Sequence, residues 1–265
     1  MLLKGKTAIV YGGGGAIGGA IARTFAREGA KVFIAGRTLP PLQKVASDIH
    51  QNGGAVDIAQ VDALDPSSVS RHTEHVVAAS GRIDVSLNAV GITHVQGPPF
   101  AELSLDDFLF PTAAYLKANF ITAKAAAPTM IQQGSGVILT LSTPGSRMTG
   151  VGFLGYGVTC GAIETFSRIL AGELGSSGIR VVCLRPDAMP ETLPTSHART
   201  VFEGFAGRAG VSVETMFAER AQQVSLLGRA PLLSEVAEFA AFVASDRAGA
   251  MTGAIANLTC GSVVD

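Results

Sequence analysis

Short runs of apolar, largely β-branched residues alternate along the chain with longer stretches in which apolar residues recur every three or four positions. The short runs predict strands at Thr7–Tyr11, Lys31–Ala35, Ala55–Val61, Ile83–Asn88, Gly136–Ser142, Ile179–Arg185 and Ala254–Thr259. The longer stretches predict helices over 16–28, 40–51, 66–80, 105–133, 155–176 and 234–245. Continuous apolar strands separated by helices are typical of a parallel sheet covered on both faces. With right-handed crossovers, this order predicts a doubly wound α/β fold of seven parallel strands.

One segment interrupts this alternation. Residues 187–225 form a long insertion between the sixth strand and the last helix. The insertion carries Pro190, Pro194, Phe202, Phe205, Met216 and Phe217. A connection of this length inside a compact domain usually has a function, so we expect a substrate lid, with a surface helical hairpin as the alternative. No repeat or low-complexity linker occurs, and we expect residues 1–265 to form a single domain.

Composition excludes several classes of partner. Only 15% of the 265 residues are charged, against a usual ~25%, and the net charge is −1 without a cluster of Lys and Arg. We therefore expect no nucleic-acid partner and no membrane partner, and no apolar run approaches the ~18 residues of a membrane span. The N-terminal residues lead into the first strand without the apolar stretch of a signal peptide. The unclustered Cys160, Cys183 and Cys260 fit a reducing, cytoplasmic setting better than a disulfide framework, and they predict no metal site.

A glycine-rich loop follows the first predicted strand. The sequence Tyr11-Gly-Gly-Gly-Gly-Ala-Ile-Gly-Gly19 lies between that strand and the first helix. Glycines at this junction allow a tight turn and close approach of a pyrophosphate, and the helix N-terminus supplies free N–H groups. The position predicts a Rossmann-type dinucleotide site, with Gly12, Gly15 and Ile17 as contact residues.

The end of the second strand bears on the choice of cofactor. No Asp or Glu occurs between Glu28 and Asp48, whereas Arg37 lies two residues after the predicted strand. A carboxylate here would bind the ribose 2′-hydroxyl of NAD, and a cation would bind the 2′-phosphate of NADP. Because the guanidinium can bind two phosphate oxygens, we expect NADP(H), with NAD(H) as the alternative. A merely solvated Arg37 would leave the choice open.

These motifs, in their order along the chain, resemble those of the short-chain dehydrogenase/reductases. Gly12 and Gly18 match the family's Thr-Gly-x-x-x-Gly-x-Gly loop, although Tyr11 and Ala16 depart from it. Further partial matches are the adenine-holding Val61-Asp62-Ala63, the segment Asn88-Ala89-Val90-Gly91 in place of Asn-Asn-Ala-Gly, Leu226–Arg229, and Thr252-Gly253 through Gly261. The resemblance implies cofactor contacts from Asp62, Ala63, Asn88, Val90, Gly91, Pro186 and Thr192. Thr192 is displaced by one residue from the family position, and Asp187 replaces the Gly that normally follows Pro186.

The resemblance also implies the catalytic residues. Tyr156 occupies the place of the family's acid/base tyrosine, and Asn119 matches the asparagine of the fourth helix. Thr143 lies 13 residues before Tyr156, the spacing of the family's serine, and Ser142 is the alternative. We expect Tyr156 to contact both the cofactor and the substrate.

The family's lysine, four residues after the tyrosine, is replaced by Cys160, and no lysine follows Lys124. Two unit charges ~5 Å apart at an effective dielectric constant of ~20 interact by roughly 3 kcal/mol. Loss of that cation therefore leaves the pKa of Tyr156 higher by about two, so the phenol should stay protonated. Arg147 and Arg185 could act as surrogate cations or serve only structural roles. Cys160 could act as a nucleophile or as a buried hydrophobe, and His94 as a proton donor or as an ordinary loop residue.

A protonated phenol can still donate a proton, whereas alcohol oxidation needs its base form. We therefore expect an NADPH-dependent reductase of a carbonyl or similar polarised double bond in a fairly apolar small molecule. The alternative is a dinucleotide-binding sensor or partner subunit that has lost turnover. In the family the fourth and fifth helices pair across a two-fold axis, which implies a homodimer or homotetramer.

Overall fold

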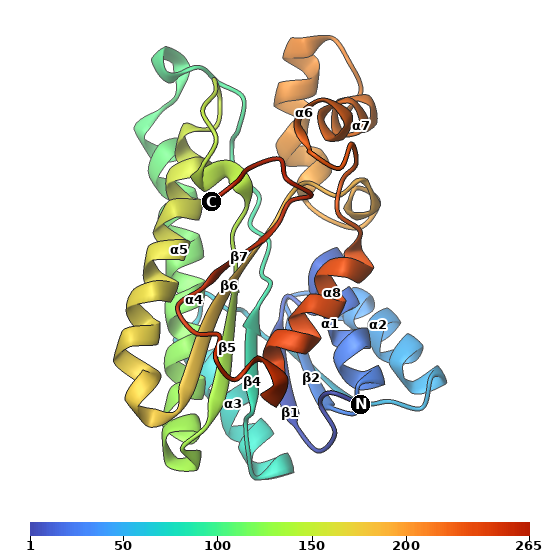
Figure 1. Ribbon diagram of the computed structural model, residues 1–265, viewed down its shortest axis with the longest axis vertical. Coiled ribbons are helices and arrows are strands. Elements are labelled where there is room, and N and C mark those ends of the chain that lie inside the picture. The colour runs from blue at the N-terminus through green and yellow to red at the C-terminus, as the bar shows by residue number, and fades with distance from the viewer.

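Seven parallel strands form one twisted sheet in the order β3-β2-β1-β4-β5-β6-β7, which confirms the predicted doubly wound Rossmann-type fold (Figure 1). The computed structural model describes all 265 residues. The strands are β1 (Thr7–Tyr11), β2 (Lys31–Gly36), β3 (Ala55–Gln60), β4 (Val85–Asn88), β5 (Gly136–Leu141), β6 (Ile179–Pro186) and β7 (Ile255–Leu258). Because the order reverses between β1 and β4, the loops after these two strands diverge and leave a crevice at their carboxyl ends.

Eight α-helices surround the sheet. They are α1 (Ala16–Arg27), α2 (Leu39–Gln51), α3 (Pro66–Ser80), α4 (Leu105–Gln133), α5 (Leu154–Leu174), α6 (Ala198–Ala209), α7 (Val213–Val224) and α8 (Leu233–Ala244). Short 3₁₀ turns cover η1 (Phe100–Glu102), η2 (Pro144–Ser146), η3 (Gly175–Ser177), η4 (Pro190–Thr192) and η5 (Asp246–Ala248). None of the helices is long and apolar enough to cross a membrane.

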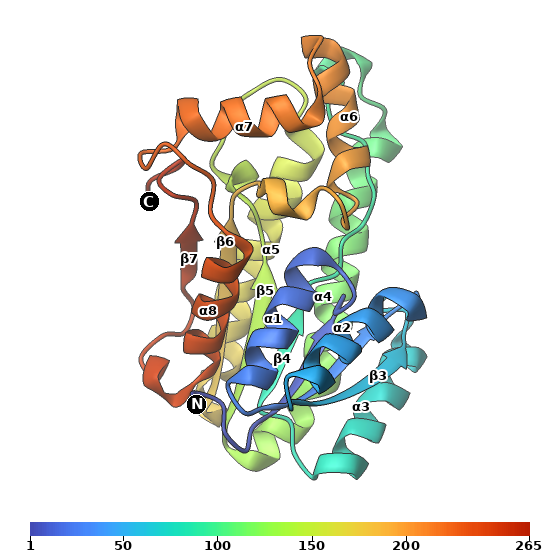
Figure 2. The same cartoon turned by 90° about the vertical axis from the view of Figure 1, so that its right-hand side faces the viewer.

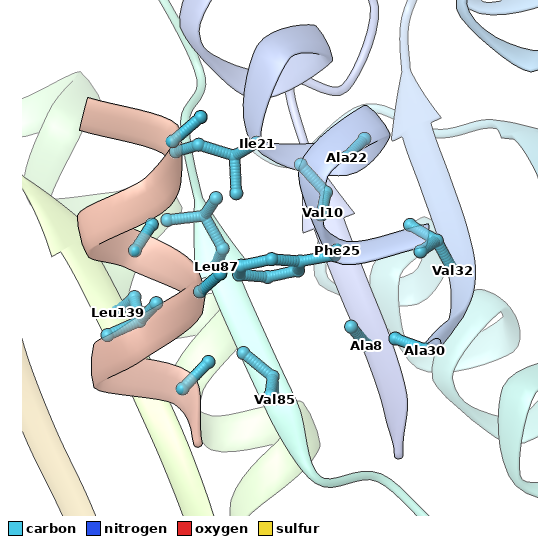
Figure 3. Close-up of a cluster of buried hydrophobic side chains, with 14 of the residues drawn as sticks. Ala8, Val10, Ile21, Ala22, Phe25, Ala30, Val32, Val85, Leu87 and Leu139 are labelled. Atoms are coloured by element: carbon cyan, nitrogen blue, oxygen red, sulfur yellow. The ribbon is translucent and has the colours of Figure 1, made fainter. Parts of the chain in front are cut away.

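The two faces of the sheet carry separate apolar cores. On one face α1, α2 and α8 bury a cluster of 26 residues, in which Phe25 of α1 packs beside Val10 and Leu87 of the strands (Figure 3). On the other face α3, α4 and α5 cover a second cluster of 16 residues that includes Phe33 and Met130. The sheet is thus buried on both sides, as its continuous apolar strands predict.

The predicted start of the fourth strand is wrong by two residues. The ladder of β4 begins at Val85 rather than at Ile83. Asp84 meets β1 through two contacts: its carboxylate accepts a hydrogen bond from the backbone N–H of Thr7 at 2.8 Å, and its own backbone N–H donates to the Thr7 carbonyl at 2.8 Å. A carboxylate therefore replaces a backbone group at the edge of this ladder.

The 187–225 segment folds into η4, α6 and α7, which lie beyond the carboxyl ends of the strands (Figure 2). A small cluster formed by Leu193, Ala206, Val213 and Phe217 holds the helices together. The segment is thus a helical hairpin, and its inner side chains also line the cavity described below.

Candidate active site

A cavity of about 880 Å³ opens at the carboxyl ends of the strands, below α6 and α7. All the site residues predicted from the sequence line this one cavity. They are Gly12, Gly15, Ile17, Arg37, Asp62, Ala63, Asn88, Val90, Gly91, Asn119, Thr143, Tyr156, Pro186 and Thr192. The fold therefore brings together residues from eight separate segments of the chain.

The glycine-rich loop is shaped for close approach to a ligand. Gly12 has a φ of +78°, and a Cβ atom there would collide with the carbonyl of Ala89. A Cβ atom on Gly18 would in turn collide with the carbonyl of Gly12. Helix α1 begins at Ala16 without a side-chain cap, and the N–H groups of Ala16 and Ile17 have no acceptor in the protein. Free amides at a helix N-terminus fit a pyrophosphate.

Arg37 is exposed at the end of β2 and forms no ion pair, although Gln60 donates a hydrogen bond to its carbonyl at 2.9 Å. Its guanidinium donors are therefore free at the cavity wall. Asp62 accepts a hydrogen bond from the backbone N–H of Leu64 at 3.0 Å, and the neighbouring Ala63 is buried. These residues form the end of the cavity next to β2 and β3.

Asn88 makes its side-chain contacts within the protein. Its amide donates to the Thr122 hydroxyl at 3.3 Å and its carbonyl accepts from the Val90 N–H at 3.0 Å. The side chain thus fixes the turn that carries Val90 and Gly91 along the cavity wall. The imidazole of His197, at the start of α6, packs against Gly91 so closely that a Cβ atom there would collide with the ring.

Tyr156, in the first turn of α5, is flanked by aromatic rings. His94 stacks on it with centroids 4.4 Å apart, and Tyr115 of α4 lies 5.7 Å away. Burial, followed by the nearby Tyr115 and Cys160, raises the pKa of Tyr156 well above its ordinary value of 10. The phenol is therefore protonated at neutral pH.

Cys160 lies one helical turn after Tyr156 and is fully buried. Its Sγ lies 3.2 Å from the hydroxyl of Thr143, which also accepts a weak hydrogen bond from the Gly145 N–H. Burial raises the pKa of the Cys160 thiol to about 12. The thiol is neutral near pH 7, which agrees with a buried hydrophobe and leaves no cation at this position.

Neither arginine considered as a surrogate cation reaches Tyr156 as a free charge. Arg185 is buried in β6, where its guanidinium pairs with Glu164 at 3.5 Å and with the carboxylate of Asp265. Arg147 is exposed and does not line the cavity. The structural interpretation of both arginines therefore agrees with the geometry.

Ser142, the alternative to Thr143, belongs to this buried polar group. Its hydroxyl donates to Glu164 at 3.0 Å, and the Ser146 hydroxyl donates to the same carboxylate oxygen at 2.6 Å. Glu164 thus gathers two hydroxyls and one guanidinium. Because the Ser142 hydroxyl already donates its hydrogen bond to Glu164, Ser142 is less able than Thr143 to donate to a ligand in the cavity.

His94 is held in its loop by both ring nitrogens. Nδ1 lies 2.7 Å from the carbonyl of Ile92, and Nε2 lies 2.7 Å from the side-chain nitrogen of Gln96. Nδ1 must donate to the carbonyl, so Nε2 accepts from Gln96, and burial lowers the pKa of the ring. A neutral imidazole with both nitrogens engaged orients Tyr156 and does not supply a proton.

Asn119 and Thr192 are both buried. Asn119 donates from its amide to the Tyr115 carbonyl at 2.9 Å, and its Oδ1 has no partner in the protein. Thr192 donates from its hydroxyl to the Met189 carbonyl at 2.7 Å. Asn119 thus carries a buried acceptor without a partner in the cavity wall, whereas the Thr192 hydroxyl is already engaged.

Sequence patterns did not predict several residues of the cavity wall, among them His197 and Arg220. Arg220 of α7 pairs with Asp187 at 3.3 Å, and Asp187 also accepts from the hydroxyl of Ser262. For Arg220 the sequence held one signal: Asp187 stands where the family has Gly, and a carboxylate that is buried needs a partner. The sequence did not indicate which cation would supply it.

Comparison with known proteins agrees with this site. The family model described as enoyl-(acyl carrier protein) reductase matches residues 14–262. The oxidoreductase UcpA of Escherichia coli O157:H7 is 32% identical over 252 residues, covering 95% of this chain and 92% of that protein. The chain belongs to the short-chain dehydrogenase/reductase family. It is therefore related to oxidoreductases that use NAD(P)(H).

Other members of the short-chain dehydrogenase/reductase family show the same likeness. The D-threitol dehydrogenase of Mycolicibacterium smegmatis is 27% identical over 95% of this chain and 90% of its own length. A short-chain dehydrogenase/reductase structure from Mycobacterium ulcerans superposes with a TM-score of 0.86 at 26% identity, covering 99% of this chain and 91% of that one. A 7α-hydroxysteroid dehydrogenase structure with NADH and 7-oxo glycochenodeoxycholic acid superposes with a TM-score of 0.84 at 25% identity. The match covers 99% of this chain and 96% of that one.

Proposed function

We propose that this short-chain dehydrogenase/reductase is an NADP(H)-dependent reductase of a carbonyl, or a similarly polarised double bond, in a fairly apolar small molecule. The observation that carries the proposal is the protonated Tyr156 phenol in the cavity beside a neutral Cys160. A phenol with a raised pKa is a proton donor at neutral pH and a poor proton acceptor. Reduction uses the donor form, whereas alcohol oxidation requires the base.

The residues present fit the cofactor. The free amides of Ala16 and Ile17 would hold the pyrophosphate, and the unpaired Arg37 guanidinium would hold the 2′-phosphate that distinguishes NADP. Ala63 would contact the adenine. NADPH supplies the hydride when it is bound.

At the other end of the cofactor site, five of the lining residues would flank the nicotinamide and its ribose. They are Asn88, Val90, Gly91, Pro186 and Thr192. Asn88 would act through the turn that it holds, because its side chain is engaged by Thr122 and Val90. Thr192 would act through its backbone, because its hydroxyl is engaged by Met189.

Three side chains would carry the proton chemistry. Tyr156 would donate its phenolic proton to the substrate oxygen as negative charge develops there. The Thr143 hydroxyl would donate a hydrogen bond to the same oxygen, because its contact with the Cys160 thiol is weak and easily exchanged. Asn119, through its unpartnered Oδ1, would hold an ordered water that returns a proton to Tyr156.

The 187–225 segment would act as a lid over an apolar substrate. Phe205 of α6 stacks on Phe153 with centroids 4.4 Å apart, so the lid already contacts the loop before α5. Met148, Phe202 and Met216 extend the same apolar wall. Burial of an apolar body against these side chains would hold the carbonyl near Tyr156 and exclude water.

We also propose a homo-oligomer that pairs through α4 and α5. These helices lie side by side on one side of the molecule, and their outer face is not covered by another element (Figure 1). Phe120 of α4 is 54% exposed and Ile169 of α5 is 60% exposed. An apolar face of this kind on a chain of low charge favours self-association through a two-fold interface.

The test is NADPH consumption over a broad panel of aldehydes, ketones and enones, with product identification and with Tyr156→Phe as the control. The proposal predicts turnover of at least one apolar carbonyl compound and a loss of at least a hundredfold in Tyr156→Phe, which removes the proton donor at nearly constant volume. Tight NADPH binding without turnover on any compound would instead support a cofactor-binding sensor or partner subunit.

A further inference from the structure

Arg220 places a cation in the wall of the apolar end of the cavity. It projects from α7, and its Nη2 lies 3.2 Å from the sulfur of Met148, in the loop between β5 and α5. The same nitrogen lies 3.3 and 3.5 Å from the two carboxylate oxygens of Asp187, at the end of β6. The guanidinium therefore bridges the lid and the ends of the strands beside the space assigned to the substrate.

The ion pair with Asp187 leaves most of this guanidinium unused. Charged N–H···O hydrogen bonds normally measure about 2.7–2.9 Å, so contacts of 3.3 and 3.5 Å are long. Asp187 has shorter partners, since its Oδ1 accepts from the Ala188 N–H at 2.7 Å and its Oδ2 accepts from the Ser262 hydroxyl. Only Nη2 of Arg220 has a partner, whereas a guanidinium carries five N–H donors.

The two arginines of the cavity wall lie at opposite ends. Arg37 follows β2, at the end assigned to the 2′-phosphate, and Arg220 lies over β6 among Met216, Phe217 and Met148. His94 and His197, the histidines of this wall, have pKa values lowered by burial and are neutral. Arg220 is thus the cation available to a substrate that otherwise contacts apolar side chains.

We propose that Arg220 binds the carboxylate of an otherwise apolar carbonyl substrate, so that the site selects apolar oxo acids over their uncharged analogues. This inference rests on the proposed function, because it concerns the substrate of the same reductase. Free N–H donors arranged in a planar fork match the two oxygens of a carboxylate. Asp187 holds the side chain in place, and the surrounding apolar groups strengthen its attraction for an anion.

Equilibrium binding to the protein–NADPH complex tests the proposal without depending on turnover. The probes are 4-phenylbutanoate and its uncharged analogue 4-phenylbutanamide, titrated by calorimetry. We expect the acid to bind at least tenfold more tightly than the amide to the parent protein. Arg220→Met should remove this difference, and Arg220→Lys should keep part of it, because Lys retains the charge but not the planar fork.

Arg147→Met is the matched control. It removes the same charge from the residue next to Met148, but Arg147 is exposed and does not line the cavity, so the preference for the acid should be unchanged. Equal binding of acid and amide by the parent protein, or a preference that survives in Arg220→Met, would overturn the proposal. A tenfold weaker affinity for NADPH in Arg220→Met would also overturn it, because Arg220 would then contact the cofactor.

Turnover separates this inference from the proposed function. Reduction of carbonyl compounds with no preference for acids would support the proposed reductase and contradict the proposed role of Arg220. Binding of the acid through Arg220 without turnover of any carbonyl compound would support the anion site and contradict the proposed reductase. Unchanged circular dichroism and melting temperature in Arg220→Met and Arg220→Lys would show that a loss of binding does not reflect unfolding.

Discussion

The imidazole of His94 stacks on the phenol ring of Tyr156, with centroids 4.4 Å apart and planes inclined by 24°. His94 is itself fixed by the carbonyl of Ile92 and the side chain of Gln96. The loop after β4 therefore orients the proposed proton donor, although its sequence contains no recognisable catalytic motif.

Replacing His94 should slow reduction by loosening Tyr156. A stacked pair of this kind contributes about 0.5–1.5 kcal/mol, so His94→Ala should lower kcat by about two- to tenfold. His94→Phe keeps an aromatic ring at the position, so its kcat should fall less than that of His94→Ala. The measurement is kcat at saturating NADPH, with NADPH affinity as the control. An Ala variant as fast as the parent, or a Phe variant slower than the Ala variant, would contradict this role.

Arg37 should determine the preference between the two cofactors. We expect tighter binding of NADPH than of NADH, and we expect Arg37→Asp to abolish the preference, because the new carboxylate repels the 2′-phosphate and can bind the ribose hydroxyl instead. Fluorescence titration of both cofactors at one salt concentration measures the ratio. Equal affinities in the parent protein would refute the assignment of Arg37.

His72 should make the protein less stable in acid. It is buried in α3, and burial, followed by repulsion from His75, lowers its pKa from 6.5 to about 4. As the pH falls through 6.5 the unfolded chain takes up this proton before the folded protein does, so the free energy of unfolding falls with the pH. The loss from His72 alone is on the order of 3 kcal/mol by pH 4.

Urea unfolding at about pH 7 and about pH 4.5 measures this effect, with His72→Phe as the comparison. The ring of His72 lies edge-on to Tyr11, with centroids 5.6 Å apart, so phenylalanine can keep this packing without the titrating nitrogen. The variant should lose less stability than the parent protein between the two pH values. An equal loss would show that His72 is not responsible.

The outer face of α4 and α5 should hold the proposed oligomer together. Light scattering at micromolar concentration should give a multiple of the 27.1 kDa chain mass, and Phe120→Glu with Ile169→Glu should lower it toward one chain. In a two-fold interface the same surface occurs on both subunits, so each substitution places a negative charge on both sides of the contact and the charges repel. A parent protein that is a monomer at this concentration would refute the proposal.

Local sequence signals predicted the elements that depend on local physics. Helix α3 begins where the Asp65 carboxylate accepts from the Ser67 N–H, and α4 begins where the Ser104 hydroxyl accepts from the Asp107 N–H. Both starts agree with the prediction because a capping side chain and its partner lie within three residues. The glycine-rich loop was predictable as well, because its glycines also lie next to one another in the sequence.

Contacts between distant segments were not predictable in this way. The His94–Tyr156 stack joins residues 62 positions apart, and the Asp187–Arg220 pair joins the end of β6 to α7. No periodicity encodes such pairs, since they depend on how the loops close over the sheet. The family pattern indicated which residues line the cavity. It did not indicate that the Asn88 side chain would bind Thr122 and Val90, or that the Thr192 hydroxyl would bind the Met189 carbonyl.

The central claim is that Tyr156 acts as a protonated donor because Cys160 supplies no charge. The most direct test compares the pH dependence of carbonyl reduction and alcohol oxidation in the parent protein and in Cys160→Lys, both shown to be folded and to bind NADPH. In the parent, reduction should exceed oxidation and should not vary with pH through the neutral range, because the pKa of Tyr156 lies well above it. In Cys160→Lys, oxidation should rise by roughly ten- to a hundredfold and its optimum should move to lower pH, since the new cation stabilises the phenolate against the cost of burying the charge. A parent protein that oxidises alcohols as fast as it reduces carbonyls at neutral pH, or a Lys variant slower than the parent in oxidation, would contradict the account.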